Sequence, residues 1–260
     1  MKTISPVFST KPPSALSQFV KRIFVVESPH VRRHTVLPDT GFVLAFRFQG
    51  DCTLDGFVRL PRAVITGMRD TARSFTHDKG SAVILAALTE TGAAAFLREP
   101  ASDFFNSTIA LDAVWGTAAA LNLTVEQLAE ARNHAHRIRI LESYLYSCIR
   151  EMEPDPNVSA AVQAIKDAGA DVRIGKLARH VGLSQSALER RFRRTVGTSP
   201  RTFASIVRFR NALRLRTSGM DLTTVAYSAG YYDQSHFIND FKRVTGLAPQ
   251  RFFQEQPAFC

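Results

Sequence analysis

Hydrophobic and polar residues alternate in two different ways along this chain, and the pattern changes a little past the middle. In the first part, short apolar runs stand between turn residues, most clearly at 41–48 (GFVLAFRF) and 81–88 (SAVILAAL). Runs of this length bounded by Gly and Asp are typical of buried β-strands. From residue 159 onward, apolar residues recur every three or four positions, the spacing of an amphipathic helix. The pattern therefore predicts a strand-rich first part and a helical second part.

Helices are also predicted at the end of the strand-rich part. Residues 91–100 predict a short helix that stops at Pro100, and residues 124–150 predict a longer one. The longer helix has one apolar stripe, formed by Leu128, Ala135, Ile138, Leu141, Leu145 and Ile149. Such a stripe either covers the sheet or packs against the same helix of a second subunit, and the sequence leaves both possibilities open.

The stretch EMEPDPNVS, residues 151–159, marks a boundary between the two parts. Two prolines around an aspartate cannot continue the preceding helix, and Asn157 is of the type that caps the start of the next one. We therefore predict one domain over residues 1–153 and a second over residues 154–260.

Charge divides the chain at nearly the same place. Residues 157–260 contain 16 Lys and Arg against 7 Asp and Glu, a net charge of +9, whereas the whole chain has +10. A nearly neutral part joined to a strongly basic part indicates two tasks, the second directed at a polyanion such as nucleic acid. A basic surface that serves only solubility is the alternative.

The basic part contains an internal repeat. Ala178 and Gly182 recur 48 residues later as Ala226 and Gly230. Five further positions recur 49 residues later: Leu188, Phe192, Gly197, Pro200 and Phe203 become Phe237, Phe241, Gly246, Pro249 and Phe252. Each copy has the pattern of a short helix, a turn with glycine and a second helix, which predicts two helix-turn-helix units. Predicted helices cover residues 159–170, 174–182, 185–197 and 202–217, and Ser184 and Asp233 are predicted N-caps.

The second helix of each copy carries polar residues opposite its apolar side. They are Gln185, Ser186, Glu189, Arg190 and Arg193 in the first copy, and Gln234, Ser235, Ile238, Asn239 and Lys242 in the second. Gln, Asn and Arg form paired hydrogen bonds with base edges, and Ile contacts the methyl group of thymine. We therefore expect these residues to contact DNA bases. Flanking arginines are better placed for phosphates: Arg191, Arg194, Arg201 and Arg243.

Residues 159–253 closely resemble the DNA-binding domain of AraC/XylS-type bacterial transcription regulators. The resemblance rests on LARHVGLSQSALERRFRRTVGTSP and VAYSAGYYDQSHFINDFKRVTGLAPQRF, and GYYDQSHFINDFKRVTGLAP is similar to the family's C-terminal signature. It implies an all-α domain in which a linker helix, here about residues 202–216, holds both recognition helices on one face of double-stranded DNA. Glu189 departs from an ideal base-reading face: it either accepts a hydrogen bond from cytosine or weakens that contact.

The first domain has a looser resemblance. Residues 36–50 and 92–116 look like a poorly characterised sensor domain of some AraC relatives. This resemblance implies an α+β domain, with a cupin-like β-rich region followed by helices. In this family such a domain senses a small molecule, dimerises or does both. We therefore expect a small-molecule effector, a homodimer and RNA polymerase as partners; a regulator of the same fold that needs no ligand is the alternative.

No feature of the sequence predicts an enzyme, a metal site or a cofactor. No nucleophile motif, phosphate-binding loop or dinucleotide motif is present. His30 and His34 are four residues apart, but Pro29 argues against the helix that would bring them together. Trp115 is expected to pack in a core and not to form a ligand platform.

Cysteine usage and hydropathy suggest a cytoplasmic protein. Cys52, Cys148 and Cys260 are far apart and form no CxxC motif, so we expect reduced thiols. No apolar run is long enough to span a membrane, and the first residues lack the apolar core of a signal peptide. Two other function classes are less consistent with the sequence: a DNA-alkylation-response protein, which the scattered cysteines disfavour, and a protein-binding module, which the basic helix faces disfavour.

Overall fold

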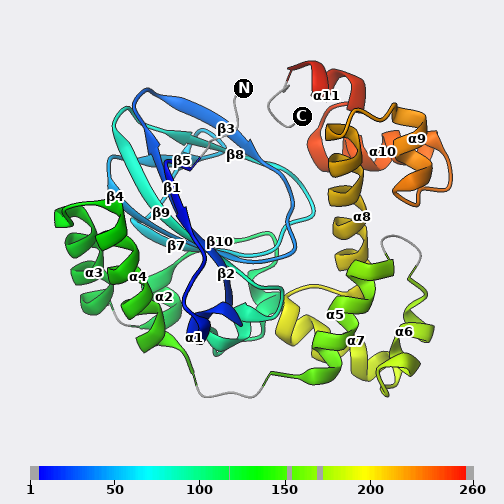
Figure 1. Cartoon of the computed structure of the whole chain (residues 1–260), viewed down its shortest axis with the longest axis horizontal. Helices are drawn as coiled ribbons and strands as arrows, with labels where there is room; N and C mark the ends of the chain where they lie inside the picture. Colours follow the sequence, from blue (N-terminus) through cyan, green and yellow to red (C-terminus); the bar gives the residue numbers. More distant parts are fainter. Residues whose placement is uncertain (1–5, 117, 151–153, 169–171, 256–260) are drawn as a thin grey trace.

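A computed structural model of the chain describes residues 6–116, 118–150, 154–168 and 172–255. A strand-rich N-terminal part lies beside a helical C-terminal part, as the change in hydrophobic pattern predicts (Figure 1). The predicted domain boundary after residue 153 falls at residues 151–153, outside the described residues.

The N-terminal part contains two antiparallel sheets. The six-stranded sheet has the order β1 (Phe8–Thr10), β2 (Val20–Ser28), β9 (Ser81–Leu88), β4 (Val43–Gln49), β7 (Ala63–Thr66) and β10 (Thr108–Ala110). The four-stranded sheet has the order β3 (Arg32–Val36), β8 (Arg73–His77), β5 (Cys52–Leu54) and β6 (Val58–Arg59). Strands β4 and β9 confirm the two strands predicted from the sequence. They pair at the centre of the larger sheet, where burial makes strands continuously apolar.

Helices α3 (Ala118–Glu130) and α4 (His134–Cys148) cover one side of the six-stranded sheet (Figure 1). Leu128, Ile138, Leu141 and Leu145 of these helices are buried in the same core as the sheet residues Leu44 and Phe46. The apolar stripe therefore covers the sheet, which was one of the two possibilities. Ala135 was wrongly included in the stripe, because its side chain is exposed.

The single helix predicted over residues 124–150 is in fact two helices. Asn133 interrupts it, because its side-chain oxygen accepts a hydrogen bond from the backbone N–H of His136 and caps the start of α4. The short helix predicted over residues 91–100 is present as a 3-10 helix, η1 (Gly92–Ala95), but it ends well before Pro100, and a second 3-10 helix, η2 (Ala101–Phe104), follows that proline. A Cβ on Gly92 would lie 2.1 Å from the carbonyl oxygen of Phe19, so this segment packs closely on the chain before β2. The remaining helices of this part are α1 (Ser14–Ser17) and α2 (Leu111–Trp115).

The C-terminal part contains seven helices within the described residues. They are α5 (Pro156–Ala168), α6 (Ile174–His180), α7 (Gln185–Val196), α8 (Pro200–Thr217), α9 (Leu222–Ser228), α10 (Gln234–Thr245) and α11 (Pro249–Glu255). The predicted helices are present with small changes at their ends, and the last residues of the one predicted over 159–170 lie outside the described residues. Helix α8 begins earlier than predicted, because Pro200 is favourable in a first turn and Ser199 Oγ accepts from the backbone N–H of Thr202.

The predicted cap of α5 is wrong by two residues. Asp155 accepts from the backbone N–H groups of Asn157 and Val158, so it stabilises the start of the helix. The Asn157 side chain donates instead to the carbonyl of Val181 at the end of α6. Asn157 thus joins two helices and does not cap one.

Helix α8 joins the two helix-turn-helix units by contributing to both of their cores. Phe203, near its start, contacts Phe192 of α7 with ring centroids 5.4 Å apart. Phe209, two turns later, contacts Phe241 of α10 at 5.4 Å. The first unit shares one continuous apolar core with the six-stranded sheet, whereas the second unit has a separate core that includes Leu37 of the N-terminal part.

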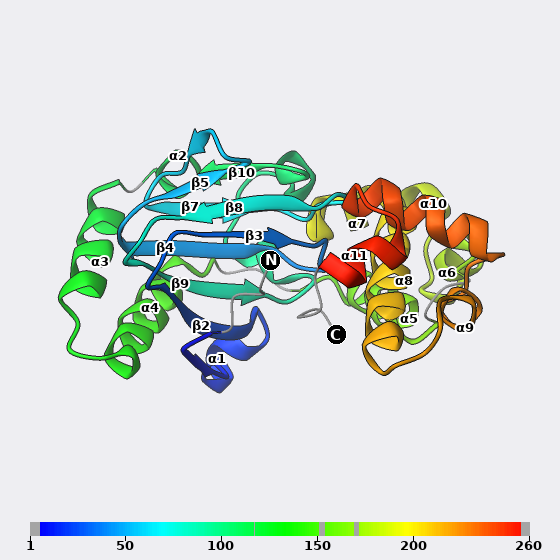
Figure 2. The same ribbon diagram turned by 90° about the horizontal axis from the view of Figure 1, so that it is seen from above.

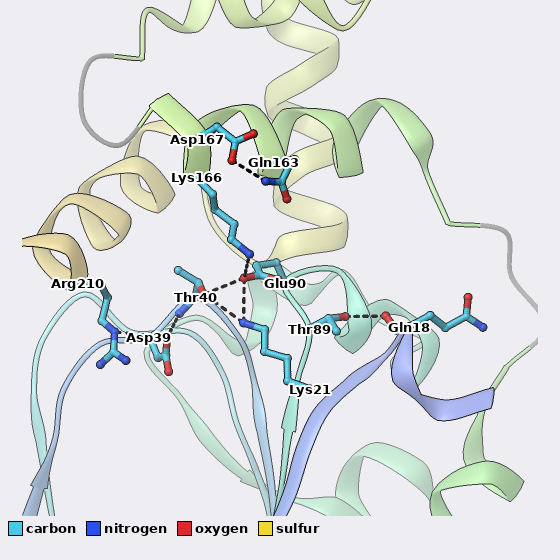
Figure 3. Close-up of polar contacts among 10 residues, drawn as sticks. All are labelled: Gln18, Lys21, Asp39, Thr40, Thr89, Glu90, Gln163, Lys166, Asp167 and Arg210. Carbon is cyan, nitrogen blue, oxygen red and sulfur yellow. Dashed lines mark hydrogen bonds and ion pairs between the residues drawn. The ribbon is translucent and has the colours of Figure 1, made fainter. Parts of the chain in front are cut away.

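A buried carboxylate connects the two parts (Figure 3). Glu90 follows β9, and its Oε1 atom accepts from Lys21 Nζ at 2.9 Å, Thr40 Oγ1 at 3.1 Å and Lys166 Nζ of α5 at 3.0 Å. Burial alone would raise the pKa of Glu90, but the two lysines outweigh it and hold the pKa at about 2. Asp39 and Arg210 of α8 add a second, more exposed pair at 3.7 Å.

Candidate nucleic-acid interface

The first candidate recognition helix, α7, is fixed at both ends. Ser184 Oγ accepts from the backbone N–H of Ala187 at 3.2 Å, which confirms the predicted N-cap. Gly197 ends the helix at φ +96°, and a Cβ there would also lie 2.9 Å from the Phe42 ring. Leu188 and Phe192 are fully buried. The orientation of α7 is therefore set by its cap, its apolar side and its contact with the N-terminal part.

The second candidate recognition helix, α10, has the same construction. Asp233 Oδ1 accepts from the backbone N–H of His236 at 2.7 Å, so this predicted cap is also confirmed. Phe237 and Phe241 are fully buried, and Gly246 ends the helix at φ +78°. The equivalent local structures confirm that the sequence repeat corresponds to two copies of one helix-turn-helix unit.

The predicted base-contacting residues lie on the outer sides of these helices. Eight of them are exposed: Gln185, Ser186, Arg190, Arg193, Gln234, Ser235, Asn239 and Lys242. Glu189 and Ile238 are half-buried. Exposure makes a contact with bases sterically feasible, and the contacts themselves stay predictions.

The four predicted phosphate-contacting arginines differ in their surroundings. Arg194 and Arg201 are exposed, and Arg201 lines a cleft of about 260 Å³ that Arg243 and Asp70 also line. Arg243 Nη2 lies 2.9 Å from Asp240 Oδ1, and Arg243 Nη1 lies 3.9 Å from Asp70 Oδ2. A phosphate would have to compete with these carboxylates for Arg243.

Arg191 is also held by an acidic residue. Its Nη1 atom lies 3.5 Å from Asp155 Oδ2, so one carboxylate both caps α5 and pairs with α7. Arg191 was predicted to contact a phosphate, and its spacing from Asp155, which is 36 residues earlier in the chain, gives no sign of this ion pair. Only the fold brings the two residues together.

A polar cluster between α8 and α10 was missed from the sequence. Tyr231 donates its hydroxyl to Asp240 Oδ2 at 3.0 Å, and the Arg208 guanidinium lies 4.5 Å from the Tyr231 ring centroid and 3.7 Å from Asp240. Burial, and then the charge of Asp240, raise the pKa of Tyr231 above its ordinary value. The cluster fixes the position of α10 on the linker helix. In the sequence, only the presence of an acidic residue, Asp240, in a basic segment could have indicated this cluster.

The described residues contain no group of three or more His, Cys, Asp or Glu side chains that could hold a metal ion. His34 belongs to β3, so the helical pair with His30 does not form. Trp115 Nε1 donates to the carbonyl of Phe96, and its ring lies 5.9 Å from that of Tyr144, which confirms a packing role. None of the described helices is both long and apolar enough to cross a membrane.

Comparisons with known proteins match the two parts separately. Residues 177–255 match a helix-turn-helix domain family, and residues 9–110 match a domain family of unknown function, DUF6597. The arabinose operon regulatory protein of Salmonella typhimurium is 38% identical over 101 residues, which are 38% of this chain and 36% of that protein. An AraC-like putative transcription regulator of Streptomyces lividans is 34% identical over 97 residues, 36% of this chain and 32% of that protein. The match thus spans about a third of the length of these curated relatives.

The whole fold is also found in a solved structure. ToxT from Vibrio cholerae aligns with a TM-score of 0.50 at 12% identity, over 89% of this chain and 97% of that one. At this identity the likeness concerns the fold, a β-rich domain followed by a helical domain. Over its C-terminal helix-turn-helix domain, the chain is similar to AraC-type transcription regulators.

Proposed function

We propose that this protein is a transcription regulator that binds specific sequences of double-stranded DNA. The observation that carries the proposal is the pair of capped helices, α7 and α10, each with its apolar side buried and its polar side exposed in one basic domain. Arg, Asn and Gln on those exposed sides provide the hydrogen-bond pattern that reads base edges in a major groove.

The linker helix supports reading of two successive grooves. Helix α8 has 18 residues and is therefore about 27 Å long. Successive major-groove segments on one face of DNA are about 34 Å apart. Because Phe203 and Phe209 anchor α8 in the two cores, the linker transmits a fixed orientation from one unit to the other. We propose that both units contact one DNA site at the same time.

The N-terminal part is proposed to make DNA binding responsive to a small molecule. Its two sheets enclose a cavity of about 430 Å³, within the range of about 300–1,000 Å³ of small-molecule sites. A ligand that favours one arrangement of the two parts would shift the population that binds DNA. RNA polymerase and a second copy of the chain are further proposed partners, and we expect the protein to act in the cytoplasm without catalysing a reaction.

The experiment that tests this function selects DNA sites with the full chain from a random pool and then measures affinity. We expect a selected sequence to bind far more tightly than its scrambled version, with affinity falling steeply between about 50 and 200 mM salt as counterions are released. Equal affinity for both sequences would contradict specific regulation. No binding at any salt concentration would favour a protein-binding module, and loss of function on changing all three cysteines to serine would favour an alkylation-response protein.

A further inference from the structure

The cavity between the sheets has apolar walls and an excess of positive charge. Its walls include Phe24, Val43, Val83 and Leu85 of the larger sheet and Phe75 of the smaller one. Six arginines also line it: Arg22, Arg47, Arg62, Arg69, Arg73 and Arg210. The only carboxylate among the lining residues is Asp39, and Asp39 already pairs with Arg210.

The histidines of the cavity do not add to this charge. His34 and His77 stack with ring centroids 5.2 Å apart. Burial, together with the charge of His77 and of Arg32, lowers the pKa of His34 to about 3. Burial likewise lowers the pKa of His77, so the positive charge of the cavity at neutral pH comes from its arginines.

Arg69 is the buried arginine of the cavity that forms no ion pair with the described residues, although Asp55 attracts it at longer range. Only 7% of its surface is exposed, and it donates to the carbonyl of Asn106 at 2.8 Å and to Thr108 Oγ1 at 2.6 Å. Both acceptors are neutral, and no carboxylate of the described residues lies within ion-pair distance. Its Nε atom is buried without a hydrogen-bond partner. A buried guanidinium in this state is unfavourable unless an anion reaches it.

Arg73 has the same feature. It pairs with Asp55 through Nη1 at 2.7 Å, but its Nε atom is buried and has no hydrogen-bond partner among the described residues. Arg69 and Arg73 both line the cavity, so two buried guanidinium N–H groups there are left without an acceptor.

The other buried arginine of the cavity has a structural role. Arg47 donates to the backbone carbonyls of Gly50 and Leu60 and to Asp51. Its hydrogen bonds tie the end of β4 to the following loop. Of the two buried arginines of the cavity, Arg69 is therefore the one with an N–H group left for a ligand.

We propose that this cavity binds an organic anion whose apolar body lies between the sheets and whose carboxylate is held by Arg69, with Arg73 beside it. A carboxylate accepts two parallel hydrogen bonds from a guanidinium, a geometry that an uncharged ligand cannot match. The proposal rests on the proposed function and names organic carboxylates as the class of effector that would bind in the N-terminal part.

The segment that carries these arginines also contacts the second helix-turn-helix unit. Between Arg69 and Arg73, Asp70 Oδ2 lies 3.9 Å from Arg243 Nη1 of α10, and the backbone N–H of Ala72 donates to the carbonyl of Val244 at 2.8 Å. An anion that repositions Arg69 and Arg73 therefore acts on the residues that hold α10. Its binding changes the affinity of the protein for DNA through this short segment.

The test uses the full chain and two probes with neutral counterparts: octanoate against octan-1-ol, and 4-phenylbutyrate against 4-phenylbutan-1-ol. Calorimetry without DNA measures the ligand site alone. We expect each carboxylate to bind about tenfold or more tightly than its alcohol, since charge-assisted hydrogen bonds are the stronger ones. Equal affinity of acid and alcohol in both pairs would overturn the proposal, whether or not the protein binds DNA.

Variants assign the preference to the proposed residue. Arg69→Gln should abolish the preference for the acid and leave the affinity for the alcohol unchanged. Arg59→Gln is the matched control, because Arg59 is an exposed arginine of the same domain that pairs with Asp51 and does not line this cavity. If Arg69→Gln fails to fold, Arg73→Gln at the half-exposed neighbour should reduce the preference. If a folded Arg69→Gln protein still prefers the acid to the alcohol as strongly as the wild type, Arg69 does not hold the carboxylate. The same result for Arg73→Gln, where Arg69→Gln does not fold, would also refute the proposed carboxylate site.

A second measurement tests the connection to α10. Octanoate should change the affinity of the wild-type protein for its selected DNA site about threefold or more, whereas Asp70→Asn should reduce this response while octanoate still binds. Bound octanoate with unchanged DNA affinity would overturn the connection and leave the ligand site standing. A protein that binds octanoate but no DNA would contradict the proposed function alone.

Discussion

Arginine side chains of the helical part differ in whether they form ion pairs within the protein. Arg190 and Arg194 are exposed, with no ion pair in the part of the chain that the structure describes. Arg191 and Arg243 are paired with Asp155 and Asp240. Equal charge therefore does not mean equal availability, and the exposed pair provides the clearest test of the two kinds of DNA contact.

Replacing Arg190 by alanine should weaken binding to the selected site by about 1–3 kcal/mol and relax the preference at one base pair. The reason is that Arg190 lies on the outer side of α7, where a guanidinium can pair with a base edge. Affinities for a panel of single-base variants check this expectation. Equal weakening on every sequence would exclude a base contact by Arg190.

Replacing Arg194 by alanine should instead weaken binding to all sequences similarly and reduce the salt slope by about 1, because a phosphate contact releases counterions without reading a base. Affinities at several salt concentrations, for the selected and scrambled sites, measure the slope. An unchanged slope would contradict a phosphate contact by this residue.

Glu90 offers a test that does not depend on DNA. Its pKa of about 2 lies below the ordinary 4.5, so its ionised form stabilises the folded state. That contribution is complete above about pH 4.5 and is lost as the pH falls toward 2.

Glu90→Gln should therefore lower the free energy of unfolding at pH 7 by about 2–4 kcal/mol, because two lysines lose their buried partner. The stability of this variant should also depend less on pH below 4.5. Denaturant unfolding across this pH range measures both effects, and unchanged stability at pH 7 would contradict the role of Glu90.

Two helices with the same local construction belong to different cores. Helix α7 shares its core with the six-stranded sheet, whereas α10 packs in the separate core of the second unit. Phe241 is central to that second core, since its ring lies between 5.2 and 5.6 Å from those of Phe209, Phe237, Phe252 and Phe253. The second unit therefore depends strongly on one side chain.

Replacing Phe241 by alanine should destabilise the second unit by about 3–5 kcal/mol, through lost burial and the resulting cavity. Specific DNA binding should be lost with it. Circular dichroism during denaturant unfolding and DNA affinity are the measurements. Tyr227→Ala is the control for removing an aromatic ring, because Tyr227 is 60% exposed on the neighbouring helix α9. A Phe241→Ala protein as stable as this control would refute the placement of Phe241.

The whole molecule is held together by contacts that cross between its two parts. Figure 2 shows the helical part lying beside the ends of the sheets, next to the loops that join the strands. Leu37, from the loop after β3, is buried in the core of the second unit. Two ion pairs also cross between the parts: Glu90 with Lys166 of α5, and Asp39 with Arg210 of α8. The loops around the cavity thus form much of the surface on which the helical part rests.

Replacing Leu37 by aspartate should separate the second unit from the N-terminal part, because a charge would enter an apolar cluster. We expect a larger radius of gyration in small-angle X-ray scattering. Val31→Asp, at a position that is 68% exposed, is the matched control for an added charge. Unchanged scattering from a folded Leu37→Asp protein would show that Leu37 does not hold the interface.

The repeat, the caps and the apolar sides of α7 and α10 were predictable from the sequence. Helical spacing and capping act over a few residues, so the capping role of Ser184 and Asp233 and the burial of the phenylalanines in each unit can be predicted from neighbouring residues alone. Strands β4 and β9 were predictable because burial makes them continuously apolar. The shorter strands, such as β5 and β6, were not, since half-exposed segments of two or three residues have no pattern distinct from a loop.

Only the tertiary structure decided which distant residues meet. It placed Glu90 between Lys21 and Lys166, Asp155 beside Arg191, and Asp70 beside Arg243. It also placed Arg69 in the cavity between the sheets, with an Nε atom that has no hydrogen-bond partner among the described residues. Such pairings depend on how separate elements pack, and residue spacing carries no information about them. The sequence by itself determined that two helix-turn-helix units form, because their interactions are local, whereas the cavity between the sheets and the contacts of its lining segment with α10 arise only when the sheets and the helices fold against each other.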